Sequence, residues 1–241
     1  MSGDDSGLRV DDCGDSGLLV TVTGAGDRPW HVAREVAAAL RSAGPDGLVD
    51  VVASYASVFV AFDPLRVSAA DLRELVTRRP AGAGLVPSRE FLVPVVYGGE
   101  HGEDLDEVAG ALGIGADDVV ALHTARPWTV RLLGPPAGMP MTDGGPVPRS
   151  VPRRADPRTR VPAGSVGLSG HQSVVYPFAM PGGWQLIGAT PALLVELDRT
   201  PPTAYAPGDA LRFVAVDAGS WSYWQRPLTD LQADLAAVHG G

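Results

Sequence analysis

The chain has 241 residues, of which 45% are hydrophobic, so it is long enough for one large or two modest globular domains with a packed core. Its formal net charge of −9 and its pI near 4.9 argue against nucleic-acid and anionic-membrane binding, which require a basic surface. No apolar run approaches the length of a membrane span, and the acidic N-terminus is unlike a signal peptide. We therefore expect a cytoplasmic protein without nucleic-acid or membrane partners.

The absence of lysine excludes several kinds of chemistry. All 19 basic residues are arginine, so the chain has no P-loop lysine, no lysine for a Schiff base with pyridoxal phosphate, and no biotin attachment site. The single cysteine, Cys13, cannot form an internal disulfide or a cysteine-based zinc site. We expect no biotin, no pyridoxal phosphate and no metal in this chain.

The first hundred residues alternate between strand and helix patterns. Short β-prone runs predict strands at residues 18–22, 49–53, 57–62 and 91–96. Apolar residues from Ala33 to Leu40 follow helical spacing, and Ser68 with Asp71 forms a capping box for a second helix. The resulting order, βαββαβ, predicts a ferredoxin-like domain at residues 1–96.

The next segments predict two helices and then short strands. Helical patterns cover residues 103–112 and 117–124, and His123 lies near the end of the second; such a histidine more often packs or caps carbonyls than acts in catalysis. Alternating runs at residues 128–133, 193–197 and 211–216 are separated by proline and glycine, which predicts a β-barrel or sandwich domain at residues 97–216. Residues 134–153 predict a long mobile loop over one barrel end.

The C-terminal segment, residues 217–241, carries three clustered aromatic residues followed by leucines at helical spacing. It reads Trp221, Tyr223 and Trp224, then Leu228, Leu231 and Leu235. An arm folded onto its own protein is the commoner interpretation, and an arm that docks on a partner is the alternative.

Residues 154–191 combine arginines, turn glycines and aromatic residues with almost no helical periodicity. Arg158 and Arg160 are two residues apart, so on a strand they project to one face and could bind a carboxylate or phosphate. Gln172 offers the donors and the acceptor that suit an amide or lactam. The alternative is that the arginines are solvated and the aromatic side chains, Tyr176 and Trp184, belong to the core.

An ordered set of motifs over about residues 13–216 resembles a known family. The motifs are Gly14-Asp15-Ser16, Asp63-Pro64-Leu65, the VPVVYGG run at 93–99, His123, Pro157-Arg158, the RVPAGSVG run at 160–167, Gln172, Tyr176-Pro177, the PGGW run at 181–184, Ile187-Gly188 and Thr190-Pro191. Together they resemble the carboxyltransferase-like family that includes the B-type subunit of bacterial ATP-dependent 5-oxoprolinase, a sporulation-kinase inhibitor, and proteins labelled allophanate hydrolase subunit 1. The resemblance implies an α+β protein whose second domain is a cyclophilin-like barrel.

The chain departs from that family pattern at three places. Relatives usually carry an aromatic loop of the form GFxPGFxYL where this chain has residues 134–141, which contain no aromatic residue. Relatives also have glycine in place of His171 and arginine in place of Ala189. These changes either retarget the ligand site or silence it.

The resemblance implies one subunit of an ATP-dependent 5-oxoprolinase that opens the 5-oxoproline lactam to L-glutamate. Its partners would be a homologous second subunit of the C type and a third subunit, with ATP bound by or shared with the complex, so the chain alone would be inactive. In this hypothesis the site residues are Arg158 and Arg160 for an anionic group, Gln172 for the amide, Tyr176 and Trp184 as walls, and His123 as a proton shuttle.

Two other functions compete with this one. A regulatory protein that inhibits a sensor histidine kinase would bind its partner and perform no chemistry, and the altered loop favours that alternative. Amide hydrolysis of the allophanate or urea type ranks lowest, because amidases of that kind use a serine and a lysine and this chain has no lysine.

Overall fold

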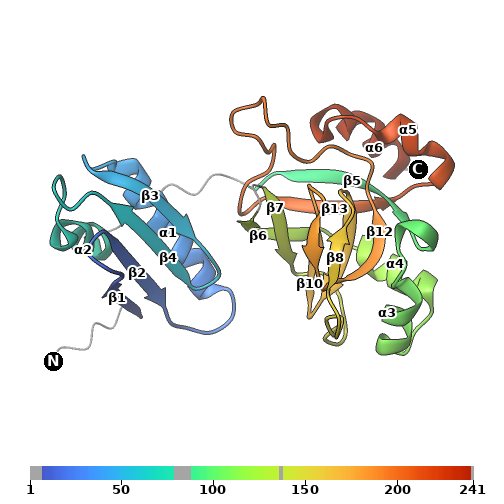
Figure 1. The fold of residues 1–241 in the computed structure, drawn as a ribbon, viewed down its shortest axis with the longest axis horizontal. Helices are drawn as coiled ribbons and strands as arrows, with labels where there is room; N and C mark the ends of the chain where they lie inside the picture. The colour runs from blue at the N-terminus through green and yellow to red at the C-terminus, as the bar shows by residue number, and fades with distance from the viewer. Residues whose placement is uncertain (1–6, 79–87, 136–137, 240–241) are drawn as a thin grey trace. The chain divides into compact units, whose positions relative to one another are not determined.

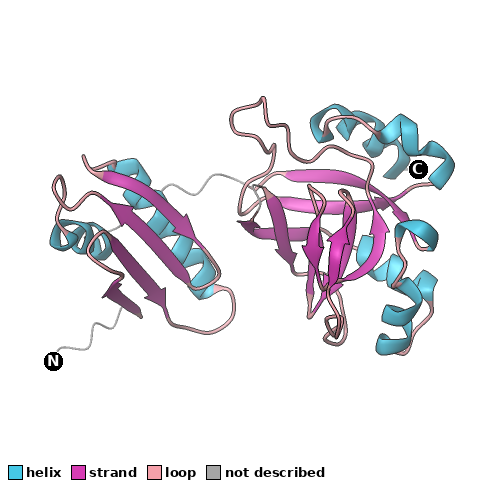
Figure 2. Ribbon diagram, viewed as in Figure 1, coloured by secondary structure: helices cyan, strands magenta, loops and turns pink. Residues whose placement is uncertain are grey.

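The computed structural model describes residues 7–78, 88–135 and 138–239, and the chain divides into two compact units, Met1–Pro87 and Ser88–Gly241 (Figure 1). The first unit holds a four-stranded sheet and the second a closed barrel, so the predicted α+β class is confirmed (Figure 2). Within the described ranges, every helix is too short or too polar to cross a membrane.

The first unit is an antiparallel sheet with two helices packed on it. In the order β1-β2-β4-β3, its strands are β1 (Leu8–Asp12), β2 (Gly17–Val22), β4 (Ser57–Phe62) and β3 (Leu48–Ala53). The helices α1 (Arg28–Ala43) and α2 (Ala69–Arg78) contact each other, and α1 also contacts β2, β3 and β4. Apolar side chains at every second strand position and at helical spacing meet in the core, among them Leu18, Val20, Val36, Leu40, Val58, Val60 and Leu72.

Local sequence signals set the ends of these helices. The predicted capping box is confirmed, because the Asp71 N–H donates to Ser68 Oγ at 3.2 Å and the Ser68 N–H donates to Asp71 Oδ2 at 3.4 Å. At its other end, α1 stops at Gly44, whose φ of 49° is left-handed and whose N–H donates to the Leu40 carbonyl.

One strand of the predicted βαββαβ order lies elsewhere. The strand β5 (Glu90–Tyr97) pairs in parallel with β13 (Ala210–Ala215) in the barrel, so its assignment to the first domain was wrong. The compact units accordingly divide before Ser88, and not at residue 96, the boundary that the sequence pattern predicts. The sheet edge beside β2 is instead occupied by β1, a strand that the sequence analysis missed because LRVDD is short and largely polar.

The second unit is built on a closed barrel of seven strands in the order β10-β7-β6-β13-β5-β12-β9. Besides β5 and β13, its strands are β6 (Trp128–Gly134), β7 (Met139–Asp143), β9 (Ser165–Ser169), β10 (Gln172–Val175) and β12 (Gln185–Ala189). A separate two-stranded ribbon pairs β8 (Arg158–Val161) with β11 (Met180–Gly182).

Two loop and strand predictions in this unit were wrong. The expected loop at residues 134–153 contains β7, which pairs with β6 and β10, although Pro136 and Ala137 lie outside the described residues. The expected strand at residues 193–197 makes only isolated bridges, from Leu193 to Pro227 and from Val195 to Thr203. Both predictions were based on prolines, which indicate where turns lie. Prolines do not determine whether the residues between two turns pair with another strand.

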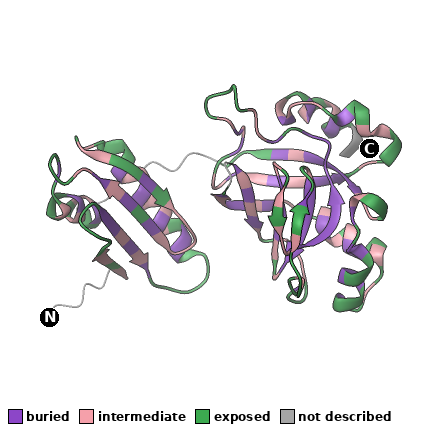
Figure 3. Cartoon of the chain, viewed as in Figure 1, coloured by how far each residue is buried: buried purple, intermediate pink, exposed green. Residues whose placement is uncertain are grey.

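Two hydrophobic clusters hold this unit together, and buried residues dominate the barrel strands in Figure 3. The larger cluster joins the barrel to α3 (Leu105–Leu112), α4 (Ala116–Thr124) and the C-terminal segment with α5 (Trp221–Trp224) and α6 (Gln232–His239). The smaller cluster contains Val161 of the ribbon strand β8, Val174 and Leu186 of the barrel strands β10 and β12, and Tyr176 and Trp184 from the segments that join barrel and ribbon. It fixes the ribbon on the barrel.

The C-terminal arm is folded onto its own unit, as the commoner of the two interpretations predicted. Leu228, Leu231 and Leu235 are fully buried in the larger cluster. The Gln232 side chain accepts a hydrogen bond from the Leu92 N–H at 2.8 Å and donates to the Leu92 carbonyl at 3.1 Å. The strand β12 pairs only with Val96 and Tyr97, at the C-terminal end of β5. The Gln232 amide therefore satisfies the backbone N–H and carbonyl of Leu92, which this pairing does not reach.

Candidate functional site

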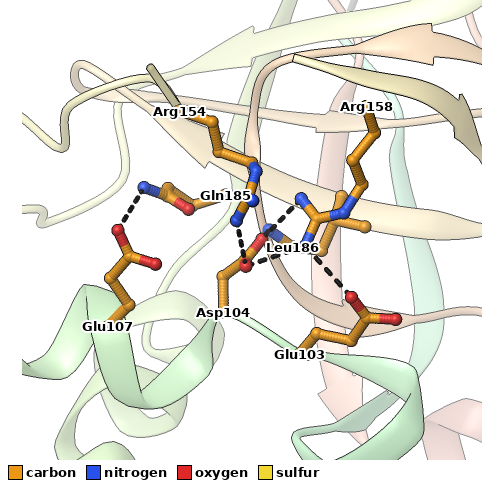
Figure 4. Close-up of polar contacts among 7 residues, drawn as sticks. All are labelled: Glu103, Asp104, Glu107, Arg154, Arg158, Gln185 and Leu186. Atoms are coloured by element: carbon orange, nitrogen blue, oxygen red, sulfur yellow. Dashed lines mark hydrogen bonds and ion pairs between the residues drawn. The ribbon is translucent and has the colours of Figure 1, made fainter. Parts of the chain in front are cut away.

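The candidate site lies where the start of α3 meets β12 and the segment that leads into the ribbon (Figure 4). Its centre is Asp104, which immediately precedes α3 and whose side chain is 4% exposed. Arg158 donates to both carboxylate oxygens, at 2.9 Å and 2.8 Å, and Arg154 donates to one of them at 2.9 Å. The Leu186 N–H of β12 donates a fourth bond, at 2.7 Å. One buried carboxylate therefore holds together a helix, a barrel strand and the ribbon.

We call this group the Asp104 cluster; its members are Glu103, Asp104, Glu107, Arg154, Arg158 and Gln185. Burial by itself would raise the pKa of Asp104, but the hydrogen bonds from Arg158 and Leu186, together with the charges of Arg158 and Arg154, hold that pKa below its usual value. The hydrogen bond to Asp104 likewise raises the pKa of Arg158. Both groups are charged at neutral pH, and Glu103 adds a second carboxylate, 3.1 Å from Arg158 Nη2.

Two polar atoms of the cluster are buried without a partner. Gln185 is 2% exposed, and its Nε2 donates to Glu107 Oε1 at 3.3 Å. The Gln185 Oε1 acceptor and the Arg154 Nε–H donor have no hydrogen-bond partner among the residues that the structure describes. Buried polar atoms are normally satisfied, so this donor and this acceptor are exceptions that call for an explanation.

The predicted aromatic walls, Tyr176 and Trp184, lie beside this cluster in the core under the ribbon. Burial raises the pKa of Tyr176, and the nearby charges of Arg153 and Arg158 act against that shift. The Arg153 guanidinium lies over the Trp184 ring, 5.4 Å from its centre. Gly182 is required here, because a Cβ at that position would collide with the Tyr176 hydroxyl. The structure thus brings Arg158, Tyr176 and Trp184 together, with both aromatic side chains buried as core residues.

The other two predicted binding residues lie at the margins of this region. Arg160 is exposed on β8, two residues from Arg158, and is not among the members of the Asp104 cluster. Gln172 is half-buried at the start of β10, opposite Ser169 of β9. Neither residue makes the contacts that define the cluster.

His123, the predicted catalytic residue, is buried at the end of α4 and is only 1% exposed. Its Nδ1 lies 2.6 Å from the Tyr97 hydroxyl and its Nε2 lies 2.9 Å from Ser173 Oγ, while its ring stacks on Phe213 at 4.2 Å. Burial lowers the pKa of His123 to about 3, so the imidazole is neutral at pH 7. This geometry matches the packing role that is commoner for such a histidine, and the proton-shuttle role stays a prediction.

The family comparison agrees with this architecture. Residues 8–205 match the family model described as carboxyltransferase domain, subdomain C and D. The chain belongs to this family. The motifs that carry the resemblance, from Gly14 to Pro191, lie within the matched range, so the family predicted from the sequence is confirmed.

Two relatives of this carboxyltransferase-domain chain share one name. The chain is 46% identical over 136 residues to the B-type subunit of 5-oxoprolinase from Escherichia coli O157:H7, which covers 56% of this chain and 62% of that protein. It is 44% identical over 126 residues to the B-type subunit of 5-oxoprolinase from Haemophilus influenzae, covering 52% of this chain and 59% of that protein. The crystal structure of TTHA0988 superposes with a TM-score of 0.74 at 34% identity, covering 84% of this chain and 40% of that one.

Several residues of the site escaped the sequence analysis of this carboxyltransferase domain. Asp104 and Glu107 read as ordinary residues at the start of a helix, and Arg154 as one of several arginines in a loop. Gln185 directly follows the PGGW motif, which was the one available signal. Within the described part of the chain, no group of three or more histidine, cysteine, aspartate or glutamate side chains is arranged to hold a metal ion.

Proposed function

We propose that this chain is the B-type subunit of an ATP-dependent 5-oxoprolinase, which opens the lactam of 5-oxoproline to L-glutamate. The observation that carries the proposal is the 44–46% identity to proteins named as B-type subunits of 5-oxoprolinase. These matches cover 59% and 62% of the two relatives, so the activity is transferred from proteins that this chain matches in part.

The chemistry of the reaction explains the need for ATP. An unactivated five-membered lactam resists hydrolysis. Transfer of the γ-phosphoryl group of ATP to the lactam oxygen releases ADP and activates the ring carbon; attack by water, loss of phosphate and cleavage of the C–N bond then give glutamate. ATP is a substrate of this reaction. Because the chain has no lysine and no P-loop, we assign ATP binding to the complex or to a site shared with a partner subunit.

We revise the roles proposed for the two arginines on the basis of their contacts and exposure. Arg158 is committed to Asp104 and Glu103, so it holds the ribbon in place and contributes charge to the site. Arg160 is exposed on the same strand and is the better candidate to meet the substrate carboxylate. His123 is enclosed, so a proton-shuttle role would require the site to open.

The name of the relatives implies a multi-subunit assembly. We propose that the partners are a homologous C-type subunit and a third subunit, and that the active site is completed only in the complex. Two departures from the family pattern do not disrupt the fold: His171 is exposed and its Nδ1 lies 3.1 Å from the Val147 carbonyl, and Ala189 is buried in β12.

The test is glutamate formation from 5-oxoproline and ATP by this chain co-purified with the products of its neighbouring genes. We expect turnover in the complex, none in the chain alone, and a strong loss in an Arg160→Ala complex that remains assembled. A stable complex without turnover, combined with loss of autophosphorylation when the chain is titrated onto a histidine kinase, would replace this proposal with the regulatory function.

A further inference from the structure

The two unpaired polar atoms of the Asp104 cluster belong to neighbouring segments. Gln185 lies at the start of β12 between Trp184 and Leu186, both of which are buried, so its side chain is held in a fixed environment. Arg154 is tied to the same stretch of chain, because its backbone N–H donates to the Gly183 carbonyl at 2.9 Å. Among the described residues, the cluster therefore has one acceptor and one donor without a partner, on segments that are hydrogen-bonded to each other.

An acceptor and a donor carried by two segments that are hydrogen-bonded to each other could complement an amide whose own donor and acceptor lie on one edge. Five-membered lactams have this arrangement, because the ring locks the amide in the cis form and places N–H and C=O side by side. An open-chain trans amide presents them on opposite edges. The pair of free atoms thus matches a small lactam better than it matches a peptide group or a carboxylate, which has no donor when ionised.

We propose that Gln185 and Arg154 form the lactam-recognition site of this subunit: Gln185 Oε1 accepts the lactam N–H, and Arg154 Nε–H donates to the lactam oxygen. This inference rests on the proposed 5-oxoprolinase function and names the residues that read its substrate. It also replaces Gln172, the glutamine that the sequence analysis selected for this role, with a glutamine that is far more buried.

The rest of the cluster fits this role. The Arg154 side chain is 30% exposed, so solvent reaches this residue, whereas Gln185 is only 2% exposed. Asp104 accepts the Arg154 Nη1 bond, which orients the guanidinium, and Glu107 accepts from Gln185 Nε2, which leaves the Gln185 carbonyl as the group that faces a ligand. Asp104 and Glu107 are thus positioning residues for the two groups that bind.

The experiment compares 5-oxoproline with its lactone analogue, 5-oxotetrahydrofuran-2-carboxylate, in which a ring oxygen replaces the N–H. Dissociation constants are measured by calorimetry on the assembled complex for wild type, Gln185→Met, Arg154→Lys and the control Gln172→Met. Glutamate formation is measured on the same samples, and circular dichroism checks folding. Gln185→Met keeps the side-chain volume, and Arg154→Lys keeps the charge beside Asp104 while removing the Nε–H.

We expect wild type to prefer the lactam over the lactone by about tenfold or more, the range of one or two buried hydrogen bonds. Gln185→Met should abolish this preference, and Gln172→Met should keep it. Arg154→Lys should weaken the binding of both ligands, because the lactam and the lactone both retain the ring carbonyl. If Gln185→Met fails to fold, the Arg154→Lys result decides.

Three results would overturn the inference: an unchanged preference in Gln185→Met, a loss of preference in Gln172→Met instead, or unchanged affinities in Arg154→Lys. If the wild-type complex still forms glutamate, the proposed function stands in each of these cases. A wild-type complex that neither binds 5-oxoproline nor forms glutamate would remove the proposed function itself and the inference with it.

Discussion

Replacing Asp104 by asparagine should destabilise the second unit more than any other single charge removal near the site. Asparagine keeps the shape of the side chain but leaves Arg154 and Arg158 without the carboxylate that three of their hydrogen bonds reach. Removing one partner of a buried ion pair costs about 3–5 kcal/mol, because the remaining charge stays buried. Arg154 and Arg158 are 30% and 17% exposed, so water compensates in part and we expect about 2–3 kcal/mol.

For a unit of this size, each kcal/mol lowers the midpoint of thermal unfolding by about 2–4 °C, so the expected loss is roughly 4–12 °C at pH 7. Circular dichroism on the full chain measures it. Asp106→Asn is the matched control: Asp106 is exposed in the first turn of α3, and its replacement should change the midpoint by at most about 2 °C.

The pH dependence provides a second readout. The folded-state pKa of Asp104 lies below its unfolded value of about 3.9, so its contribution is complete above pH 3.9 and is lost as the pH falls through the folded-state pKa. Wild type and Asp104→Asn should therefore converge in stability in strong acid. Equal midpoints at pH 7, or a difference that persists unchanged down to pH 2, would refute this account of the cluster.

Three further predictions follow from buried and exposed positions elsewhere. His123 has a folded-state pKa of about 3, against about 6.5 in the unfolded chain, so the free energy of unfolding of wild type should fall by up to about 1.4 kcal/mol per pH unit as the pH falls below 6.5. In urea titrations, His123→Gln should remove this pH dependence, and the control His171→Gln, at an exposed residue, should keep it. Leu231→Ala should cost about 2–5 kcal/mol in urea unfolding because Leu231 is fully buried, whereas Tyr223→Ala, at a side chain 54% exposed, should cost under about 1 kcal/mol. Arg160→Ala should leave unfolding unchanged within about 0.5 kcal/mol but raise the KM for 5-oxoproline about tenfold, with Arg160→Lys recovering part of the loss.

Each of these has an outcome that contradicts it. An unchanged acid slope in His123→Gln would mean that another group carries the acid sensitivity. Equal costs for Leu231→Ala and Tyr223→Ala would mean that the C-terminal arm is not packed on the barrel in solution. An unchanged KM in Arg160→Ala would remove Arg160 from substrate binding.

Sequence patterns predicted the elements whose signals are local. The helix α1 was evident from apolar spacing, and α2 from its Ser68–Asp71 capping box. The strand β5 was also found, but its partner was not, because pairing with β13 joins residues more than a hundred positions apart. The sequence of a strand predicts that the strand forms, but it does not determine which other strand it pairs with.

The site was predicted in part for a similar reason. Arg158 stood out by its spacing and its motif, and the structure places it at the centre of an ion-pair cluster. Its carboxylate partner, Asp104, lies 54 positions earlier and reads as the start of a helix, so no local pattern joins the two. Gln172 and Gln185 offer the same chemistry in the sequence, and only burial distinguishes them.

The most direct test of the central claim is an add-back experiment. The partner subunits are purified without this chain, the chain is titrated into them, and glutamate formation from 5-oxoproline and ATP is followed. The proposed role predicts no turnover before addition and activity that rises with added chain to saturation at a fixed ratio. Full activity of the partners alone, or none after a stable complex has formed, would contradict the claim that this chain is a functional subunit of a 5-oxoprolinase.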